Sequence, residues 1–360
     1  LKNKNSILPL NKKIKKVAVV GPNADNRYNM LGDYTAPQED ENIKTVLDGV
    51  ISKLSPSKVE YVRGCAIRDT TVNEIAEVVE AASRSEVIIA VVGGSSARDF
   101  KTSYQETGAA IADEKSISDM ECGEGFDRAT LTLLGKQQDL LNALKATGKP
   151  LIVVYIEGRP LDKVWASEYA DALLIASYPG QEGGYAIADV LFGDYNPAGR
   201  LPVSVPRSVG QIPVYYNKKA PCNHDYVEQA ASPLYTFGYG LSYTTFEYSD
   251  LQVMRKSPCY FEVSFKVKNT GSYDGEEVAQ LYLRDEYASV VQPLRQLKCF
   301  ERFFLKRGEE KEIFFTLTEK DLSIIDRNMK RVVETGDFRI MIGASSDDIR
   351  LTKDISVESL

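Results

Sequence analysis

Two glutamates stand among glycines in the stretch "MECGEGFDRATL", which covers residues 120–131. Glu124 lies between Gly123 and Gly125, and glycine brings backbone freedom and close approach rather than a side chain to pack. A carboxyl group in such a setting can enter a cleft and transfer a proton. Two alternatives stay open: Glu124 is a solvated loop charge, as exposed glutamates commonly are, or Glu121 is the acid.

The loop that holds these glutamates is long and rich in charge. Residues 93–128 show little periodicity and follow an apolar run that ends in glycine. Long loops of this kind in compact domains are usually functional or disordered. We expect Asp127 and Arg128 to form an ion pair or to cap a following helix, and so to position the loop. The charged residues of the loop include Arg98, Asp99, Glu106, Glu114, Asp119, Glu121, Glu124, Asp127 and Arg128.

Continuous apolar runs alternate with helical periodicity over residues 17–206. Apolar runs of this kind are typical of strands that are buried on both faces of a parallel sheet. Helical spacing of apolar residues appears over 72–85 and again over 136–145. The chain is therefore expected to begin with a mainly parallel α/β domain. Its predicted strands are "VAVVG" at 17–21, "VIIAVVGG" at 87–94, "LIVVYI" at 151–156 and "ALLIAS" at 172–177.

Glycine follows two of these runs, in "VVGPNADN" and "VVGGSSARDF". Open α/β sheets bind ligands at the carboxyl ends of their strands, so both stretches suggest a nucleotide site. Neither matches GxGxxG, and the chain contains no GxxxxGK[ST], so the residues that cradle phosphates are missing. A tight turn at the end of each strand explains these glycines better than a nucleotide site does.

The pattern changes twice in the second half of the chain. Residues 207–249 are rich in Tyr, Pro and Gly, which favours an ordered connection over a flexible linker. From about residue 251 apolar and polar residues alternate, with Phe261, Val263, Phe265 and Val267 on one face of a strand. The stretches "EEKEIFFTLT" and "GDFRIMIG" repeat this alternation. Residues 250–360 are therefore expected to form an antiparallel β-sandwich.

Composition excludes several classes of protein. With 360 residues, a formal charge of −7 and a pI near 5.2, the chain lacks the basic surface that binds nucleic acid. It has no apolar run of the roughly 18 residues that span a bilayer. The five cysteines are widely spaced and there is one histidine, His224, so neither a metal site nor a dense disulfide framework is expected.

Several longer motifs resemble the part of glycoside hydrolase family 3 that follows its N-terminal (β/α)8 barrel. They are "LKNKNSILPLNKKIKKVAVVGPNAD", "GEGFDRATLTLLGKQQDLLNAL", "GKPLIVVYIEGRPL", "ALLIASYPGQEGGYAIADVLFGDYNPAGRLPVSVP" and "FGYGLSYTTFEYS". They stand in the order and spacing of that family. The resemblance implies a flavodoxin-like α/β sandwich domain at 1–206, an ordered connection at 207–249 and a fibronectin type III-like domain at 250–360.

This resemblance implies an activity and a role for Glu124. Members of the family with a GEG-aromatic-DR motif hydrolyse terminal non-reducing β-D-glycosyl residues with retention, and the motif's second-position glutamate, here Glu124, is the general acid/base. The nucleophile is an aspartate on the barrel, which is absent from this chain. We therefore expect the chain alone to be inactive. The parent protein is expected to be a β-glucosidase, or else a β-xylosidase, without a cofactor or metal.

The resemblance also suggests residues near the substrate. Arg98, Asp99 and Phe100 suit sugar hydroxyls and stacking, and Asp33 and Tyr34 are expected at the mouth of the cleft, although loop packing explains all five equally well. The expected partners are the glycoside substrate and the barrel of the same protein. Related enzymes suggest a periplasmic or secreted location. The alternatives are a module that binds carbohydrate or protein without catalysis, and a nucleotide-binding regulator.

Overall fold

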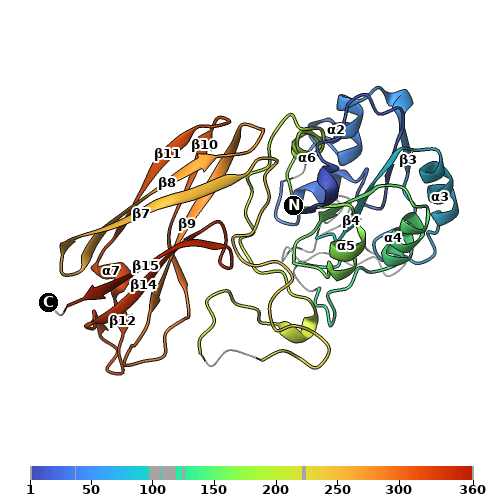
Figure 1. Cartoon of the computed structure of the whole chain (residues 1–360). Coiled ribbons are helices and arrows are strands. Elements are labelled where there is room, and N and C mark those ends of the chain that lie inside the picture. The colour runs from blue at the N-terminus through green and yellow to red at the C-terminus, as the bar shows by residue number, and fades with distance from the viewer. Residues whose placement is uncertain are drawn as a thin grey trace. The chain divides into compact units, whose positions relative to one another are not determined.

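The computed structural model describes residues 2–36, 38–96, 106, 119–123, 126–220 and 224–358. The chain divides into two compact units, Leu1–Tyr195 and Asn196–Leu360 (Figure 1). Within the described ranges, no helix has the length and apolar composition needed to cross a membrane.

The described part of the first unit is built on a six-stranded sheet with the order β1-β6-β5-β4-β2-β3. Five of the strands pair in parallel, and β1 pairs antiparallel with β6. The parallel strands follow the flavodoxin-like order, which confirms the predicted fold class. The strands are β1 (Lys2–Asn3), β2 (Val17–Val20), β3 (Val59–Val62), β4 (Val87–Gly93), β5 (Leu151–Ile156) and β6 (Ala172–Ser177).

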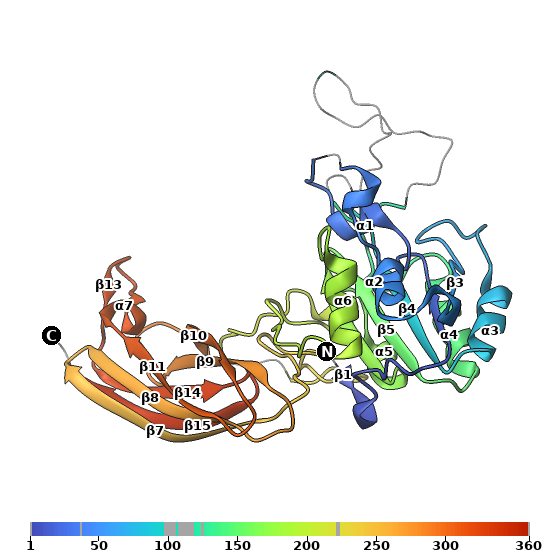
Figure 2. The same cartoon turned by 90° about the horizontal axis from the view of Figure 1, so that it is seen from above.

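Helices cover both faces of this sheet. Figure 2 shows α2 and α6 on one face and α3 and α4 on the other. The predicted helices at 72–85 and 136–145 correspond to α3 and α4. The helices of this unit are α1 (Arg27–Leu31), α2 (Val46–Lys53), α3 (Ile75–Ser83), α4 (Gln137–Ala146), α5 (Val164–Tyr169) and α6 (Gly183–Phe192).

Local chemistry explains these elements. Every residue of β2, β4 and β5 is buried, as their unbroken apolar sequences require. Helix α2 begins with a capping box in which Thr45 and Asp48 satisfy each other's backbone N–H groups. Helices α2 and α6 approach closely at Gly49 and Gly184, because a Cβ added at Gly49 would overlap the carbonyl oxygen of Gly184.

The second unit contains two antiparallel sheets, with the orders β10-β9-β14-β15 and β11-β8-β7. Phe261, Val263, Phe265 and Val267 all lie in the core between them, as the alternation predicted. The strands are β7 (Phe246–Ser257), β8 (Tyr260–Asn269), β9 (Gly275–Asp285), β10 (Gln296–Leu305), β11 (Glu310–Leu317), β14 (Gly336–Gly343) and β15 (Ile349–Val357). The short elements α7 (Glu319–Leu322), β12 (Ile324–Ile325) and β13 (Arg331–Val332) complete the sandwich.

A segment with little regular structure, residues 196–245, precedes the sandwich in this unit. Backbone hydrogen bonds hold it together, including Leu201 N to Tyr239 O at 2.9 Å and Val205 N to Tyr235 O at 2.8 Å. The rings of Tyr235 and Tyr239 stack with their centroids 5.3 Å apart. These two tyrosines therefore contribute to the packing of the segment.

Candidate active site

The candidate site lies at the carboxyl ends of β2, β4, β5 and β6. In the strand order of this sheet, the crossovers leave β2 and β4 in opposite directions, and open α/β sheets bind ligands at such a point. The chain exits β4 through Gly93 and Gly94 and leaves β5 at Glu157 and Gly158. The segments after these strands carry the polar side chains described next.

A buried network of amides and a hydroxyl fixes the exit from β4. The side chain of Asn23 donates to the carbonyl of Gly94 at 3.1 Å, and Asn29 donates to Asn23 Oδ1 at 2.6 Å. Ser95 Oγ in turn donates to Asn29 Oδ1 at 2.6 Å. All of these side chains are buried. A buried polar network in which the hydrogen bonds are satisfied is rigid and favours a single conformation. The backbone at Ser95 is therefore a rigid support.

The segment that precedes Glu124 is attached to this support. The backbone N–H groups of Glu121 and Cys122 both donate to the Ser95 carbonyl, at 2.8 and 3.3 Å. The side chain of Glu121 is only 1% exposed and pairs with Arg128, with 2.7 Å between Oε2 and Nη1. A Cβ added at Gly94 would overlap Oε1 of Glu121, so a side chain at position 94 would displace the Glu121 carboxylate.

The segment that follows Glu124 is held by the same group of side chains. Arg159 donates to the carbonyl of Phe126 at 3.1 Å, and its Nε lies 4.0 Å from Oε2 of Glu121. Arg128 also donates to the carbonyl of Thr132. Glu121, Arg128 and Arg159 thus tie down the chain on both sides of position 124. Arg128 was expected to pair with Asp127 or to cap a helix, and it pairs with Glu121 instead.

Asp33 and Tyr34, predicted at the mouth of the cleft, follow α1. A Cβ at Gly123 would lie 3.0 Å from Oδ2 of Asp33, so the Asp33 carboxylate is next to the residue that precedes Glu124. Gly123 has a φ of 109°, which favours glycine. Tyr34 is 84% exposed and presents its ring to solvent.

A tyrosine and a thiol lie behind the motif. Tyr178 follows β6, and its hydroxyl is 3.0 Å from Sγ of Cys122. Burial is the main reason that the pKa values of both groups are raised, so both stay protonated at neutral pH. A Cβ at Gly158 would lie 2.6 Å from the Tyr178 oxygen, so glycine allows this contact.

A buried ion pair supports the exit from β5. Lys163 Nζ lies 2.7 Å from Oε2 of Glu157, and both side chains are almost completely buried. Burial raises the pKa of Glu157 and lowers that of Lys163, while the attraction between the two charges opposes both shifts. Glu157 also accepts from the N–H of Leu161 at 3.2 Å. The pair closes the loop that carries Arg159.

The sequence patterns did not single out four residues that the structure places here: Glu157, Arg159, Lys163 and Tyr178. The stretch "EGRPLDK" directly after a buried strand was the available signal for the first three. The predicted residues Arg98, Asp99, Phe100 and Glu124 lie outside the described residues, so their roles stay predictions. His224 is exposed. Among the residues that the structure describes, no three His, Cys, Asp or Glu side chains form a group that could hold a metal ion.

Comparison with known proteins identifies the relatives of both units. Residues 1–243 match the glycosyl hydrolase family 3 C-terminal domain, and residues 277–346 match a fibronectin type III-like domain. A "Beta-xylosidase" of Formosa agariphila is 40% identical, over 97% of this chain and 47% of its own length. A "Periplasmic beta-glucosidase" of Salmonella typhimurium is 39% identical, over 97% of this chain and 47% of its own length.

Solved structures agree with this relationship. The β-glucosidase of Listeria innocua, determined in complex with isofagomine, has a TM-score of 0.86 at 31% identity, over 100% of this chain and 48% of that structure. The chain thus spans about half the length of the relatives that it matches.

Proposed function

Because the chain belongs to glycoside hydrolase family 3, we propose that it is the C-terminal part of a retaining β-glycosidase and supplies the general acid/base, Glu124. The nucleophilic aspartate would come from a (β/α)8 barrel in the other half of the protein. The observation that carries this proposal is the frame of Glu121, Arg128 and Arg159, which fixes the chain on both sides of position 124. A proton donor needs such a frame, since it acts only from a defined position.

The proposed reaction has two steps. The barrel aspartate attacks the anomeric carbon, and the bond to the leaving oxygen breaks as that oxygen takes the proton of the Glu124 carboxyl group. The Glu124 carboxylate then removes a proton from water, whose oxygen displaces the aspartate and releases the sugar. Retention requires the two carboxyl groups to lie about 5 to 5.5 Å apart.

The structure favours Glu124 over Glu121 as the acid. The Glu121 side chain is enclosed by protein and engaged by Arg128, which leaves it no surface for contact with a substrate. Its position supports a role in holding the loop. The glycines at 123 and 125 leave position 124 without a neighbouring side chain to obstruct a sugar.

The proposed substrate is a terminal β-D-glucosyl residue, with β-D-xylosyl as the second candidate. Relatives named as β-glucosidases and as β-xylosidases both match the chain over almost its full length.

We propose Asp33, Tyr34, Arg98, Asp99 and Phe100 as residues near the sugar. Two facts support the first two: Asp33 lies beside Gly123, and the ring of Tyr34 is exposed. The name of the Salmonella relative favours a periplasmic or secreted location.

The experiment joins this chain to the N-terminal barrel of one of its relatives and measures hydrolysis of aryl β-D-glucosides and aryl β-D-xylosides. We expect Glu124→Ala to lower turnover about 10²- to 10⁴-fold, the usual contribution of a general acid/base. Azide, a nucleophile that needs no base, should restore turnover with a reactive aryl leaving group and yield a glycosyl azide.

Two variants serve as controls. Glu77→Ala removes an exposed glutamate of α3 and should keep full activity. Glu121→Gln keeps the size of the buried side chain, and its pH–rate profile should retain the alkaline limb that Glu124→Gln loses. The proposal would be wrong if Glu124→Ala kept full turnover, or if Glu121→Gln rather than Glu124→Gln removed that limb.

A further inference from the structure

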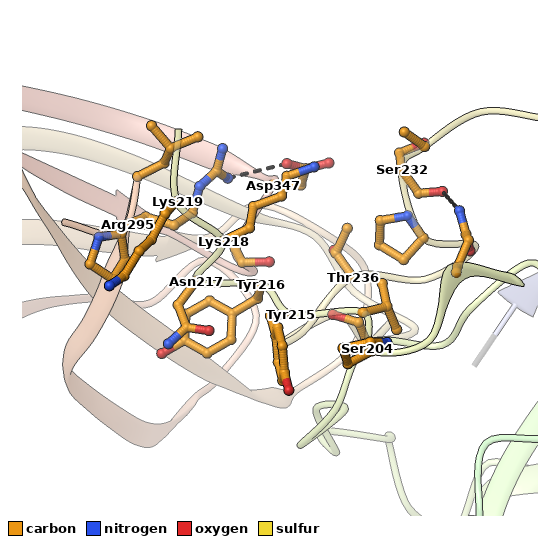
Figure 3. A pocket seen from close by; sticks show the side chains of 18 of the residues that line it. Ser204, Tyr215, Tyr216, Asn217, Lys218, Lys219, Ser232, Thr236, Arg295 and Asp347 are labelled. Carbon is orange, nitrogen blue, oxygen red and sulfur yellow. Dashed lines mark hydrogen bonds and ion pairs between the residues drawn. The ribbon is translucent and has the colours of Figure 1, made fainter. Parts of the chain in front are cut away.

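A cavity of about 790 Å³ lies within the second unit, between the segment that precedes the sandwich and two sandwich loops. Its volume falls in the range of about 300 to 1,000 Å³ that small-molecule sites occupy. Figure 3 shows Lys218, Arg295 and Asp347 on one side, Ser204 and Thr236 on the other, and Tyr215 between them.

The walls of this cavity are fixed to each other. The N–H of Leu294 donates to the carbonyl of Lys218 at 3.0 Å, and the N–H of Ser346 donates to the carbonyl of Phe237 at 2.9 Å. Tyr216 stacks on Phe237 with 4.2 Å between ring centroids, and its hydroxyl accepts from the N–H of Leu297 at 3.3 Å. The cavity is therefore a preformed part of the fold.

The far wall is equally well supported. The buried side chain of Gln211 donates to the carbonyls of Ala230 and Ser232, at 2.9 and 3.2 Å. Its own oxygen accepts from the N–H of Arg207 at 2.6 Å. One amide thus joins three points of the chain.

Tyr215 makes fewer contacts with the rest of the fold than its neighbour Tyr216 does. Tyr216 is engaged on its ring and its hydroxyl, whereas Tyr215 is 64% exposed while it lines the cavity. An exposed aromatic ring in a cavity offers a flat apolar surface, and the C–H face of a pyranose ring is a suitable partner for it.

The polar groups around Tyr215 both donate and accept hydrogen bonds. Arg295 Nη1 and Asp347 Oδ1 form an ion pair at 3.1 Å, and the Asp347 side chain is 62% exposed. Asn217 adds an amide, which has both donors and an acceptor. Lys218 and Lys219 also line the cavity and add donors. Sugar hydroxyls can accept from these cations and donate to the Asp347 carboxylate, whereas a purely anionic ligand would be repelled by Asp347 and a purely apolar ligand would form hydrogen bonds with none of these groups.

We propose that this cavity binds a neutral oligosaccharide, with one pyranose ring on Tyr215 and its hydroxyls on Asn217, Arg295 and Asp347. Every described residue that lines it belongs to the second unit, whereas the proposed acid/base belongs to the first. The cavity would hold a glycan chain on the protein independently of hydrolysis.

To test this proposal, the whole chain is titrated with two series of β-linked oligosaccharides of increasing length, one of glucose and one of xylose, and affinity is measured by calorimetry. Oligosaccharides of one series should bind, and Tyr215→Ala should weaken the affinity of the chain for them about tenfold. Tyr287→Ala, which removes an 83% exposed tyrosine elsewhere in this unit, should leave the affinity unchanged. Because Tyr215 is exposed, its variant should keep the melting temperature of the wild type.

Further arms separate this proposal from the catalytic one. Glu124→Gln should bind the oligosaccharide as the wild type does, whether or not Glu124 is the acid/base. The proposal is overturned if neither neutral series binds, or if Tyr215→Ala and Tyr287→Ala have equal effects. It is also overturned if only an acidic oligogalacturonate binds, with an affinity that salt abolishes, since the lysines would then carry the binding.

Discussion

We propose different roles for the two glutamates of the motif. Glu121 is enclosed and contacts Arg128, while the neighbours of Glu124 in the sequence are two glycines. A residue that holds a loop must be packed, and a residue that transfers a proton to a substrate must be reachable. We therefore propose that the same residue type serves two functions within four positions of the chain.

Lys163 provides a test of the buried ion pair at the residue scale. Lys163→Met leaves the Glu157 charge buried without its partner, which should lower the free energy of unfolding by about 3 to 5 kcal/mol at neutral pH. The double variant Glu157→Leu/Lys163→Met removes both charges and should recover most of this loss. Chemical denaturation of the three proteins measures both effects.

The loss of stability caused by Lys163→Met should depend on pH in a defined direction. Without Lys163, burial raises the pKa of the Glu157 carboxyl group further above its ordinary value of 4.5, and only the N–H of Leu161 still lowers this pKa. Between about 4.5 and that raised pKa, the folded state keeps a proton that the unfolded state releases, so stability falls as pH rises. The difference in the free energy of unfolding between Lys163→Met and the wild type should therefore become smaller as the pH is lowered. A difference that is constant with pH would contradict this account.

At the scale of elements, the sheet brings the site together. Residues that follow β2, β4, β5 and β6 meet because the carboxyl ends of parallel strands lie at one edge. Helices α2 and α6 then have to fit on one face, and Gly49 and Gly184 allow their backbones to approach.

Gly184→Ala tests this helix contact. A Cβ at Gly184 would overlap the carbonyl oxygen of Thr45, at the start of α2, and overpacking of this kind costs about 1 to 3 kcal/mol. We expect a lower melting temperature for this variant. Gly199→Ala is the matched control, because a Cβ there meets no atom within 4 Å. Equal stability of the two variants would mean that the helices separate easily.

At the scale of the whole molecule, the chain carries one half of a proposed pair of carboxyl groups. It spans 47% of the length of both relatives described above, and residues 1–243 match a domain that the family model itself calls C-terminal. The domain boundaries expected at residues 206 and 249 stay predictions.

The chain by itself should therefore release no aryl alcohol from an aryl β-glucoside, since a double displacement needs the nucleophile as well as the acid/base. The barrel fusion provides the positive control under identical conditions. Release by the isolated chain that depends on Glu124 would show that a nucleophile is present in these 360 residues.

Much of the fold was predictable because a strong hydrophobic pattern in a segment indicates which of its residues are buried. The apolar runs of β2, β4, β5 and β6 and the alternation in β8 were all interpreted correctly. Helix α6 was not predicted, since it begins with Gly183 and Gly184, which are weak helix formers. Its packing on α2 outweighs that preference, and packing depends on residues far away in the sequence.

Motif order and hydrophobic period are local properties of the chain, so the family, the layer architecture and the position of the candidate acid could be predicted from the residues alone. Which charged groups meet could be seen only in the folded chain. The fold places Arg159 near Glu121 and Arg295 beside Asp347, and it also places the Asp33 carboxylate beside Gly123. These partners are separated by between 38 and 90 residues, and folding alone brings such distant residues into contact.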